Sequence, residues 1–121
     1  MNVLPTSTTP ALTFHAETHT LEIAGESYPE NSFEFYRPIL AWLDETLVKD
    51  ATLTVRMRVT YMNTSSVKCV MDMFDRLEEA HQGGGAVRVL WLHVRDDERA
   101  RELGEEFKED LTLPFTIEEE A

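Results

Sequence analysis

The chain has 121 residues, of which 42% are hydrophobic, and this size and composition are typical of one globular domain with a single core. Its 11 Lys and Arg residues stand against 23 Asp and Glu residues, which gives a formal net charge of −12. A surface with this charge repels phosphate backbones and anionic lipids, so we expect neither nucleic acid nor a membrane as a direct partner.

The first residues, M-N-V-L-P-T-S-T-T-P-A, contain neither a basic leader nor a long apolar segment. No apolar run in the chain approaches the roughly 18 to 20 residues that cross a bilayer. Prolines and threonines predict a flexible N-terminal tail over residues 1–12. The single cysteine, Cys69, cannot form an internal disulfide, and its helical context fits a reduced, partly buried thiol. These features predict a cytoplasmic protein.

Two short strands are predicted next, over residues 13–16 and 20–24, with Gly25 and Glu26 in the turn that follows. The segment Y-P-E-N-S, residues 28–32, is predicted to be a loop. Its Asn31 can cap a helix, because Glu34 stands three residues further on and completes a capping box. The apolar stripe of this helix is Tyr36, Ile39, Leu40, Leu43 and Leu47. Pro38 lies inside the pattern, so we expect an irregular first turn or a later start.

A strand over residues 53–61 alternates apolar and polar side chains, which indicates that one face of the sheet is at most partly covered. A helix follows over residues 65–82. Its predicted buried stripe is Val67, Val70, Met71, Phe74, Leu77 and His81. Three glycines at 83–85 end this helix, because glycine tolerates the left-handed conformation of a helix C-terminus.

The remaining elements are a strand over 87–94, a helix over 96–110 and a short strand over 115–117. We find no internal repeat and no linker, so residues 1–121 are predicted to form a single domain. The order β-β-α-β-α-β-α-β indicates an α/β fold in which helices pack on a mixed sheet.

The sequence gives little support to catalysis. His15 and His19 lack the cysteine or carboxylate cluster that would complete a metal site. No G-x-S-x-G elbow is present, and no histidine has a context that marks it as a base. The glutamates over residues 97–110 lie opposite an apolar stripe, as expected for a solvated helix face. We therefore predict a protein that is not an enzyme and holds no metal or cofactor.

The segment Y-M-N-T-S-S, residues 61–66, lies where the strand period changes to the helix period. Asn63 or Thr64 can cap the helix, since either side chain can accept a hydrogen bond from a free backbone N–H of the first turn. A second use is also possible. A phosphate added to a hydroxyl at a helix N-terminus is stabilised by free N–H groups and by the helix dipole. The residues alone leave both interpretations open.

Residues 53–91 resemble the STAS domains of bacterial anti-anti-sigma factors, in which a strand leads into Asp-Ser-Ser-Gly and the first serine is the phosphoacceptor. Asn63, Thr64 and Ser65 fall on the aspartate and the two serines, and Ser66 stands where that family has glycine. This resemblance implies a STAS-like fold. It also implies an alternative function, that of an anti-anti-sigma factor that binds an anti-sigma kinase.

A resemblance over nearly the whole chain is to the SiaC family of bacterial regulatory phosphoproteins. It is carried by G-E-S-Y-P-E-N-S (25–32), Y-M-N-T-S-S (61–66), L-E-E-A-H-Q-G-G (77–84), and E-E-F-K-E-D (105–110) followed by P-F. It implies that Thr64 is the phosphoacceptor, modified by a cognate protein kinase and restored by a PP2C-type phosphatase. It further implies that the unmodified form binds and activates a diguanylate cyclase, which links the switch to cyclic-di-GMP and biofilm formation.

The same resemblance gives the loop at 28–31 a role in partner binding, whereas the residues alone predict only a turn and a cap. The residues expected at the partner surface are Tyr28, Pro29, Glu30, Asn31, Asn63, Ser65 and Ser66. Ser65 and Ser66 are expected to keep the first helical turn small and polar, so that a partner can approach Thr64.

Overall fold

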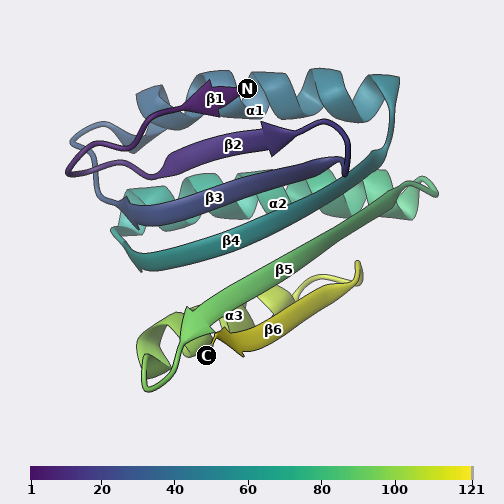
Figure 1. Cartoon of the computed structure of the whole chain (residues 1–121). Coiled ribbons are helices and arrows are strands. Elements are labelled where there is room, and N and C mark those ends of the chain that lie inside the picture. Colours follow the sequence, from purple (N-terminus) through teal and green to yellow (C-terminus); the bar gives the residue numbers. More distant parts are fainter. Residues whose placement is uncertain (121) are drawn as a thin grey trace.

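Figure 1 shows the computed structural model, which describes residues 1–120 as a six-stranded sheet with three helices. The strands are β1 (Asn2–Val3), β2 (Ala11–His15), β3 (Thr20–Ser27), β4 (Thr52–Met62), β5 (Ala86–Val94) and β6 (Phe115–Glu120). The helices are α1 (Ser32–Lys49), α2 (Thr64–Gln82) and α3 (Glu98–Glu109). Within residues 1–120, no helix combines the length and the apolar character needed to cross a membrane.

The strands are arranged in the sheet in the order in which they occur in the chain. β1 pairs with β2 and β2 with β3 in antiparallel fashion, whereas β3, β4, β5 and β6 run parallel. Each parallel connection contains one helix, as parallel neighbours require a crossover. The predicted α/β class with a mixed sheet is confirmed, and the structure adds one short strand, β1.

All three helices lie on the same face of the sheet (Figure 1), so the core forms between that face and the helices. The period of two in β4 turns one set of its side chains towards the helices. These side chains are Leu53, Val55, Met57 and Val59, and all of them are buried. The core therefore follows the predicted alternation.

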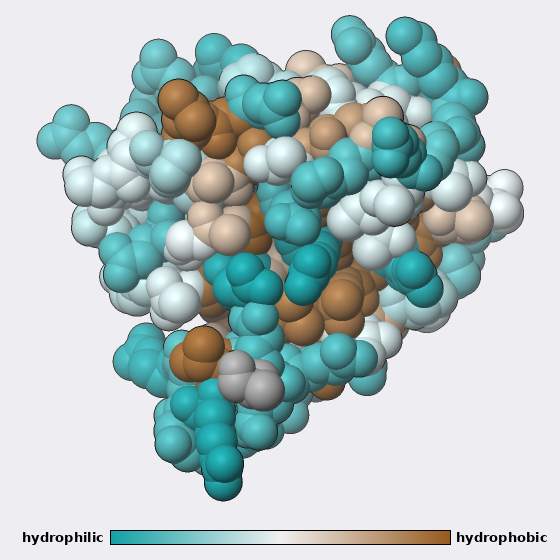
Figure 2. Space-filling view, in the orientation of Figure 1, coloured by the Kyte–Doolittle hydropathy of each residue, from teal (hydrophilic) through white to brown (hydrophobic). Residues whose placement is uncertain are grey.

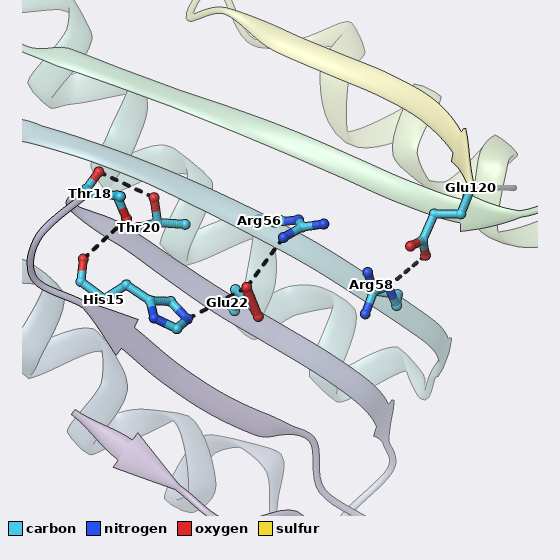
Figure 3. A network of polar contacts seen from close by, with 7 residues as sticks. All are labelled: His15, Thr18, Thr20, Glu22, Arg56, Arg58 and Glu120. Carbon is cyan, nitrogen blue, oxygen red and sulfur yellow. Dashed lines mark hydrogen bonds and ion pairs between the residues drawn. The ribbon is translucent and has the colours of Figure 1, made fainter.

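The opposite face of the sheet, here called the open face, is not covered by a helix. Figure 3 shows its polar contacts: Arg56 pairs with Glu22 at 3.3 Å, and Arg58 pairs with Glu120 at 2.6 Å. Figure 2 shows apolar side chains between the charged ones. Exposed ion pairs of this kind contribute little to stability, so their main effect is to keep an uncovered sheet face polar.

The structure differs from the predicted N-terminal tail over residues 1–12. Asn2 and Val3 form β1, which pairs with β2. Between these strands, the Thr6 hydroxyl accepts hydrogen bonds from the backbone N–H groups of Thr8 and Thr9. Side-chain hydrogen bonds of this kind can order a segment without any apolar period. The hydrophobic pattern of residues 1–12 therefore could not reveal that this segment is ordered.

Two local expectations are also corrected. Gly25 and Glu26 do not form a turn after a strand, because β3 continues to Ser27 with a register shift at this point, where Gly25 has φ +118°. The first turn of α1 is regular although Pro38 lies inside the helix. Pro38 is on the exposed side of α1. Because proline has no N–H, the carbonyl group of Glu34 has no donor within the helix, but water can hydrate it there.

α3 is held on the sheet by Trp91 of β5. The indole Nε1–H of this fully buried residue donates a hydrogen bond to the carbonyl of Ala100 at 2.8 Å. One turn further along α3, Gly104 lies directly against the indole ring. A Cβ atom at Gly104 would be 2.5 Å from Trp91 Cδ1, which is closer than real contacts permit. The absence of a side chain at Gly104 therefore lets α3 approach the sheet.

Gly104→Ala should destabilise the protein by about 1–2 kcal/mol, because the added methyl group overpacks the Trp91 site more than its better helix propensity compensates. Urea unfolding followed by circular dichroism measures this change. Gly83→Ala is the matched control, since its Cβ would meet only ordinary contacts at 3.6 Å and its φ is −80°. If the two variants are equally stable, the close approach of α3 does not depend on Gly104.

The loop between α3 and β6 is attached to α2 by Glu78. Its carboxylate accepts hydrogen bonds from the Thr112 hydroxyl, from Gln82 at 2.7 Å, and from the backbone N–H groups of Thr112 and Leu113 at 2.8 and 3.0 Å. These donors, the Thr112 hydroxyl first, lower the pKa of Glu78 to about 2. The charged carboxylate therefore stabilises the folded loop.

Because the pKa of Glu78 is lower in the folded chain, its contribution is fully present above the ordinary carboxyl pKa of 4.5 and is lost as the pH falls towards 2. Glu78→Gln should therefore be less stable than the parent protein at pH 7. The difference in stability should shrink as the pH is lowered below the ordinary carboxyl pKa of 4.5. Unfolding in urea across this pH range measures it. Glu79→Gln, at the exposed neighbouring position, should show no such convergence; a parallel pH profile for both variants would contradict the assignment.

Candidate functional site

The candidate site lies at the carboxyl ends of β3 and β4. Ser27 and Met62, the last residues of these strands, are paired in the sheet, and the N–H of Asn63 donates to the carbonyl of Ser27 at 3.0 Å. α1 and α2 begin immediately beyond this edge. Because β3 and β4 are parallel, the N-termini of both helices meet there, which is where α/β proteins commonly bind ligands.

Asn63 is the N-cap of α2. Its backbone is extended, with φ −77° and ψ 170°, and its Oδ1 accepts a hydrogen bond from the N–H of Ser66 at 2.9 Å. Its Nδ2 donates to the carbonyl of Pro29 at 3.4 Å, which connects α2 to the loop at 28–31. The capping interpretation of the N-T-S-S segment therefore applies to Asn63.

Thr64 is the first residue of α2, and it is exposed. Since Asn63 already caps the helix, the Thr64 hydroxyl is not needed for capping. In residues 1–120 no hydrogen bond to this hydroxyl is formed by another side chain or by the backbone. The structure thus separates the two roles that the sequence left open: Asn63 caps, and Thr64 presents a free hydroxyl to solvent.

The other two hydroxyls of the segment point inwards. Together with Ser27 and Ser32, Ser65 and Ser66 form what we call the serine cluster. Ser66 Oγ lies 2.8 Å from Ser27 Oγ and 3.0 Å from Ser32 Oγ, and Ser65 Oγ donates to Ser32 Oγ at 2.8 Å. The cluster joins β3, α1 and α2, and within residues 1–120 every buried polar side-chain atom has a partner.

The direction of the bonds in the serine cluster follows from the single proton of each hydroxyl. Ser27 donates to Ser66, and Ser32 donates to Asn63 Oδ1, so Ser66 must donate to Ser32. At the other end, Tyr36 donates to Ser27 at 2.8 Å. Burial raises the pKa of Tyr36 to about 12, so this donor stays protonated.

One predicted contact residue is corrected by this arrangement. Ser66 was expected at the partner surface, but its side chain is 0% exposed. Its small hydroxyl is needed between Ser27 and Ser32, so it can affect a partner only by positioning the first turn of α2. Ser27, Ser32 and Tyr36 were not predicted as members of the site, because they come from two other elements and no local period relates them to residues 63–66.

The remaining predicted residues are brought together around Thr64. Tyr28 is 38% exposed and packs edge-to-face on Tyr61, which is 48% exposed, with ring centroids 5.8 Å apart. Glu30 is exposed, and Asn31 caps α1 by accepting from the N–H of Glu34 at 3.1 Å. Tyr61 was not predicted as a site residue, because the period of two assigned it to the same face as Val59. The structure corrects this: the alternation of β4 breaks after Val59, so Tyr61 is exposed and Met62 is buried.

Phe33 is a further exposed apolar residue on this edge. It is 54% exposed in the first turn of α1, directly after Ser32 of the serine cluster. Exposed aromatic rings beside a polar site are characteristic of protein interfaces. Thr64 therefore lies on an edge that combines a free hydroxyl, two helix N-termini and three exposed rings.

The first two turns of α2 suit a negative group at Thr64. The first turn of α2 contains no acidic residue, although the chain as a whole has a net charge of −12. The backbone N–H groups there add the partial positive charge of a helix N-terminus. Lys68 is exposed one turn further on, at the i,i+4 position from Thr64, where side chains on one helix face meet. Within residues 1–120, no group of three or more His, Cys, Asp and Glu side chains is placed to hold a metal ion.

The fold and the site define the class of this protein: a mixed α/β domain that presents a free threonine hydroxyl at the start of its second helix. The chain belongs to the SiaC family of regulatory phosphoproteins, whose family model matches residues 3–120. An uncharacterised protein of Pseudomonas aeruginosa (strain UCBPP-PA14) is 41% identical over 119 residues, which are 98% of this chain and 94% of that protein.

Two solved structures are similar over the whole domain. One is the crystal structure of the diguanylate cyclase SiaD in complex with its activator SiaC from Pseudomonas aeruginosa, with 40% identity, 99% of each chain covered and a TM-score of 0.94. The other is SiaC of Pseudomonas aeruginosa, with 40% identity, 99% and 98% of the chains covered and a TM-score of 0.91. The fold described above is thus that of experimentally determined SiaC structures.

Asn63→Ala should cost about 1–2 kcal/mol of stability, because it removes both the N-cap of α2 and the bond to the loop at 28–31. Thr64→Ala, at the next residue, should stay within about 0.5 kcal/mol of the parent protein, because the Thr64 side chain is exposed and unbonded. Chemical unfolding of the two variants side by side measures the difference. A larger loss for Thr64→Ala than for Asn63→Ala would show that Thr64 is the true cap.

Proposed function

We propose that this chain is a regulatory protein that acts by binding, and that reversible phosphorylation of Thr64 controls the binding. The unmodified form binds and activates a diguanylate cyclase, and through it the level of cyclic-di-GMP and biofilm formation. The observation that carries the proposal is the exposed Thr64 hydroxyl at the N-terminus of α2, in a chain of a regulatory phosphoprotein family.

The cyclase partner is supported by the similarity to the SiaC–SiaD complex, in which SiaC is described as the activator of the cyclase. Coverage of 99% of both chains at 40% identity means that no part of the domain is missing from the comparison. A cytoplasmic location follows from this proposal, since a diguanylate cyclase and its nucleotide substrate act there.

Phosphorylation at Thr64 is supported by access and by charge. A phosphothreonine carries about −1.5 to −2 charges near neutral pH. The start of α2 accepts such a group, because its helix dipole, its free N–H groups and Lys68 are favourable and its first turn contains no carboxylate. The proposal includes a cognate protein kinase that adds the phosphate and a PP2C-type phosphatase that removes it.

The structure also offers a reason why Thr64 would be chosen from three consecutive hydroxyls. Ser66 is buried, and Ser65 donates its proton to Ser32 inside the serine cluster. Phosphorylation of either serine would require this cluster to open. Phosphorylation of Thr64 leaves all hydrogen bonds of the serine cluster in place.

The proposed partner surface surrounds Thr64. It contains the loop residues Tyr28, Pro29, Glu30 and Asn31, the cap residue Asn63, Ser65 of α2, and the exposed rings of Phe33 and Tyr61. Ser66 is buried beneath this surface and positions the first turn of α2. A dianion placed in the middle of such an interface loses hydration. Lys68 and the start of α2 offset this loss only in part unless the partner supplies a cation of its own. This penalty amounts to several kcal/mol, enough to weaken binding by orders of magnitude.

Thr64→Ala should therefore bind the cognate diguanylate cyclase with nearly the affinity of the parent protein, whereas phosphothreonine installed at position 64 should weaken binding at least tenfold. Thr64→Asp should weaken it less, because one carboxylate copies a phosphate imperfectly. Isothermal titration calorimetry and cyclase activity measure the two effects.

Thr52→Asp is the matched control, because Thr52 is also exposed but lies at the opposite end of β4. It should bind and activate the cyclase normally. If the chain with phosphothreonine at position 64 binds as tightly as Thr64→Ala, phosphorylation does not control this interaction.

A further inference from the structure

α2 and α3 do not pack closely along their length, in contrast to α1 and α2. Their contact is made by Phe74 and Phe107, whose rings meet edge-to-face at 5.1 Å. Two hollows lie beside this contact. One, of about 280 Å³, is bounded by the end of β4 (residues 59–62), by Val67 and by α3, and the other, of about 220 Å³, lies between α2 and α3. Both hollows are lined by Val67, Leu103 and Glu106, so they form one continuous groove, the α2–α3 groove.

The floor of the α2–α3 groove is apolar. Phe74 and Phe107 are buried beneath it, and Val67, Leu103 and Leu111 are partly exposed along it. Met71 was predicted to belong to the buried stripe of α2, but it is 47% exposed and lines the groove. Methionine is flexible and polarisable, and it is frequent on surfaces that bind helices of varied sequence.

The rim of the groove is acidic. Asp75, Glu102, Glu106 and Asp110 line it, and Arg99 is the one cation among the lining residues of the two hollows. In residues 1–120 these four carboxylates form no ion pair. An apolar floor between unpaired carboxylates favours a ligand with an apolar stripe and positive charges beside it.

The dimensions of the groove suit a helix. The α2 residues that line it extend from Val67 to Asp75, which corresponds to about 12 Å at the helical rise. This length accommodates about two turns of a third helix lying between α2 and α3, with apolar residues at i, i+3, i+4 and i+7 on the floor. A second copy of this chain is disfavoured as the occupant, because each copy has a net charge of −12.

We propose that the α2–α3 groove is a docking surface for a basic amphipathic helix of a partner protein. The apolar stripe of that helix covers Met71, Val67 and Leu103, and its Lys or Arg residues pair with the carboxylates of the rim. This docking does not require modification of Thr64. One end of the groove reaches Tyr61, which also belongs to the proposed partner surface around Thr64.

The probe is a labelled peptide of about 18 residues with leucines at helical spacing and lysines elsewhere. Titrated into the full-length chain, it should shift NMR signals of residues 59–75 and 99–111. Met71→Lys should weaken binding at least tenfold in fluorescence anisotropy. Val48→Lys is the matched control, because Val48 is 88% exposed on α1 and receives the same charge; it should bind the peptide as the parent does.

The charge requirement is tested separately. Glu106→Gln should weaken binding and reduce its dependence on salt, whereas Glu45→Gln, at an exposed position of α1, should not. A peptide with glutamates in place of the lysines should not bind. The proposal is overturned if the lysine peptide does not bind up to about 1 mM, if it binds Met71→Lys and Val48→Lys equally, or if the shifted signals lie elsewhere.

Discussion

The hydroxyl of Ser66 joins the three elements on which the candidate site depends. It accepts from Ser27 at the end of β3 and donates to Ser32 at the start of α1, while its own N–H is bonded to the cap of α2. A buried hydroxyl in this position is stable only if both neighbours remain in place, because an unpaired buried polar group costs about 1–3 kcal/mol. The serine cluster therefore fixes the two helix N-termini against each other and holds Thr64 at the surface in one orientation.

The charge of the protein is distributed unevenly in a way that fits two different contacts. The rim of the α2–α3 groove is strongly acidic, whereas the first turn of α2 contains no carboxylate and is followed by Lys68. A negative group is therefore tolerated at Thr64, although the chain as a whole repels anions. A positive ligand is favoured in the α2–α3 groove, which begins at Val67, less than one turn further along the same helix.

The arrangement of the helices on a single face of the sheet places these features together (Figure 1). β3 and β4 are parallel, so the loop at 28–31 and the segment at 61–66 meet at one edge although the α1 helix separates them in sequence. The open face, by contrast, carries ion pairs such as Arg58–Glu120 (Figure 3). The proposed activities of the chain thus belong to the helical side and its edge.

The sequence by itself determined the α/β class, the number of helices and the position of Thr64, because the change of period at residues 61–67 is a local property of the chain. It narrowed the cap of α2 to Asn63 or Thr64, and the structure decided for Asn63. Only the tertiary structure decided that Ser66 is buried, that Met71 is exposed and that β1 pairs with β2. The physical reason is the same in each case: whether a residue is covered or paired depends on elements that are distant in sequence. Ser66 is covered by Ser27 and Ser32, and Met71 is exposed because α3 does not pack closely on α2. A local pattern contains no information about such neighbours.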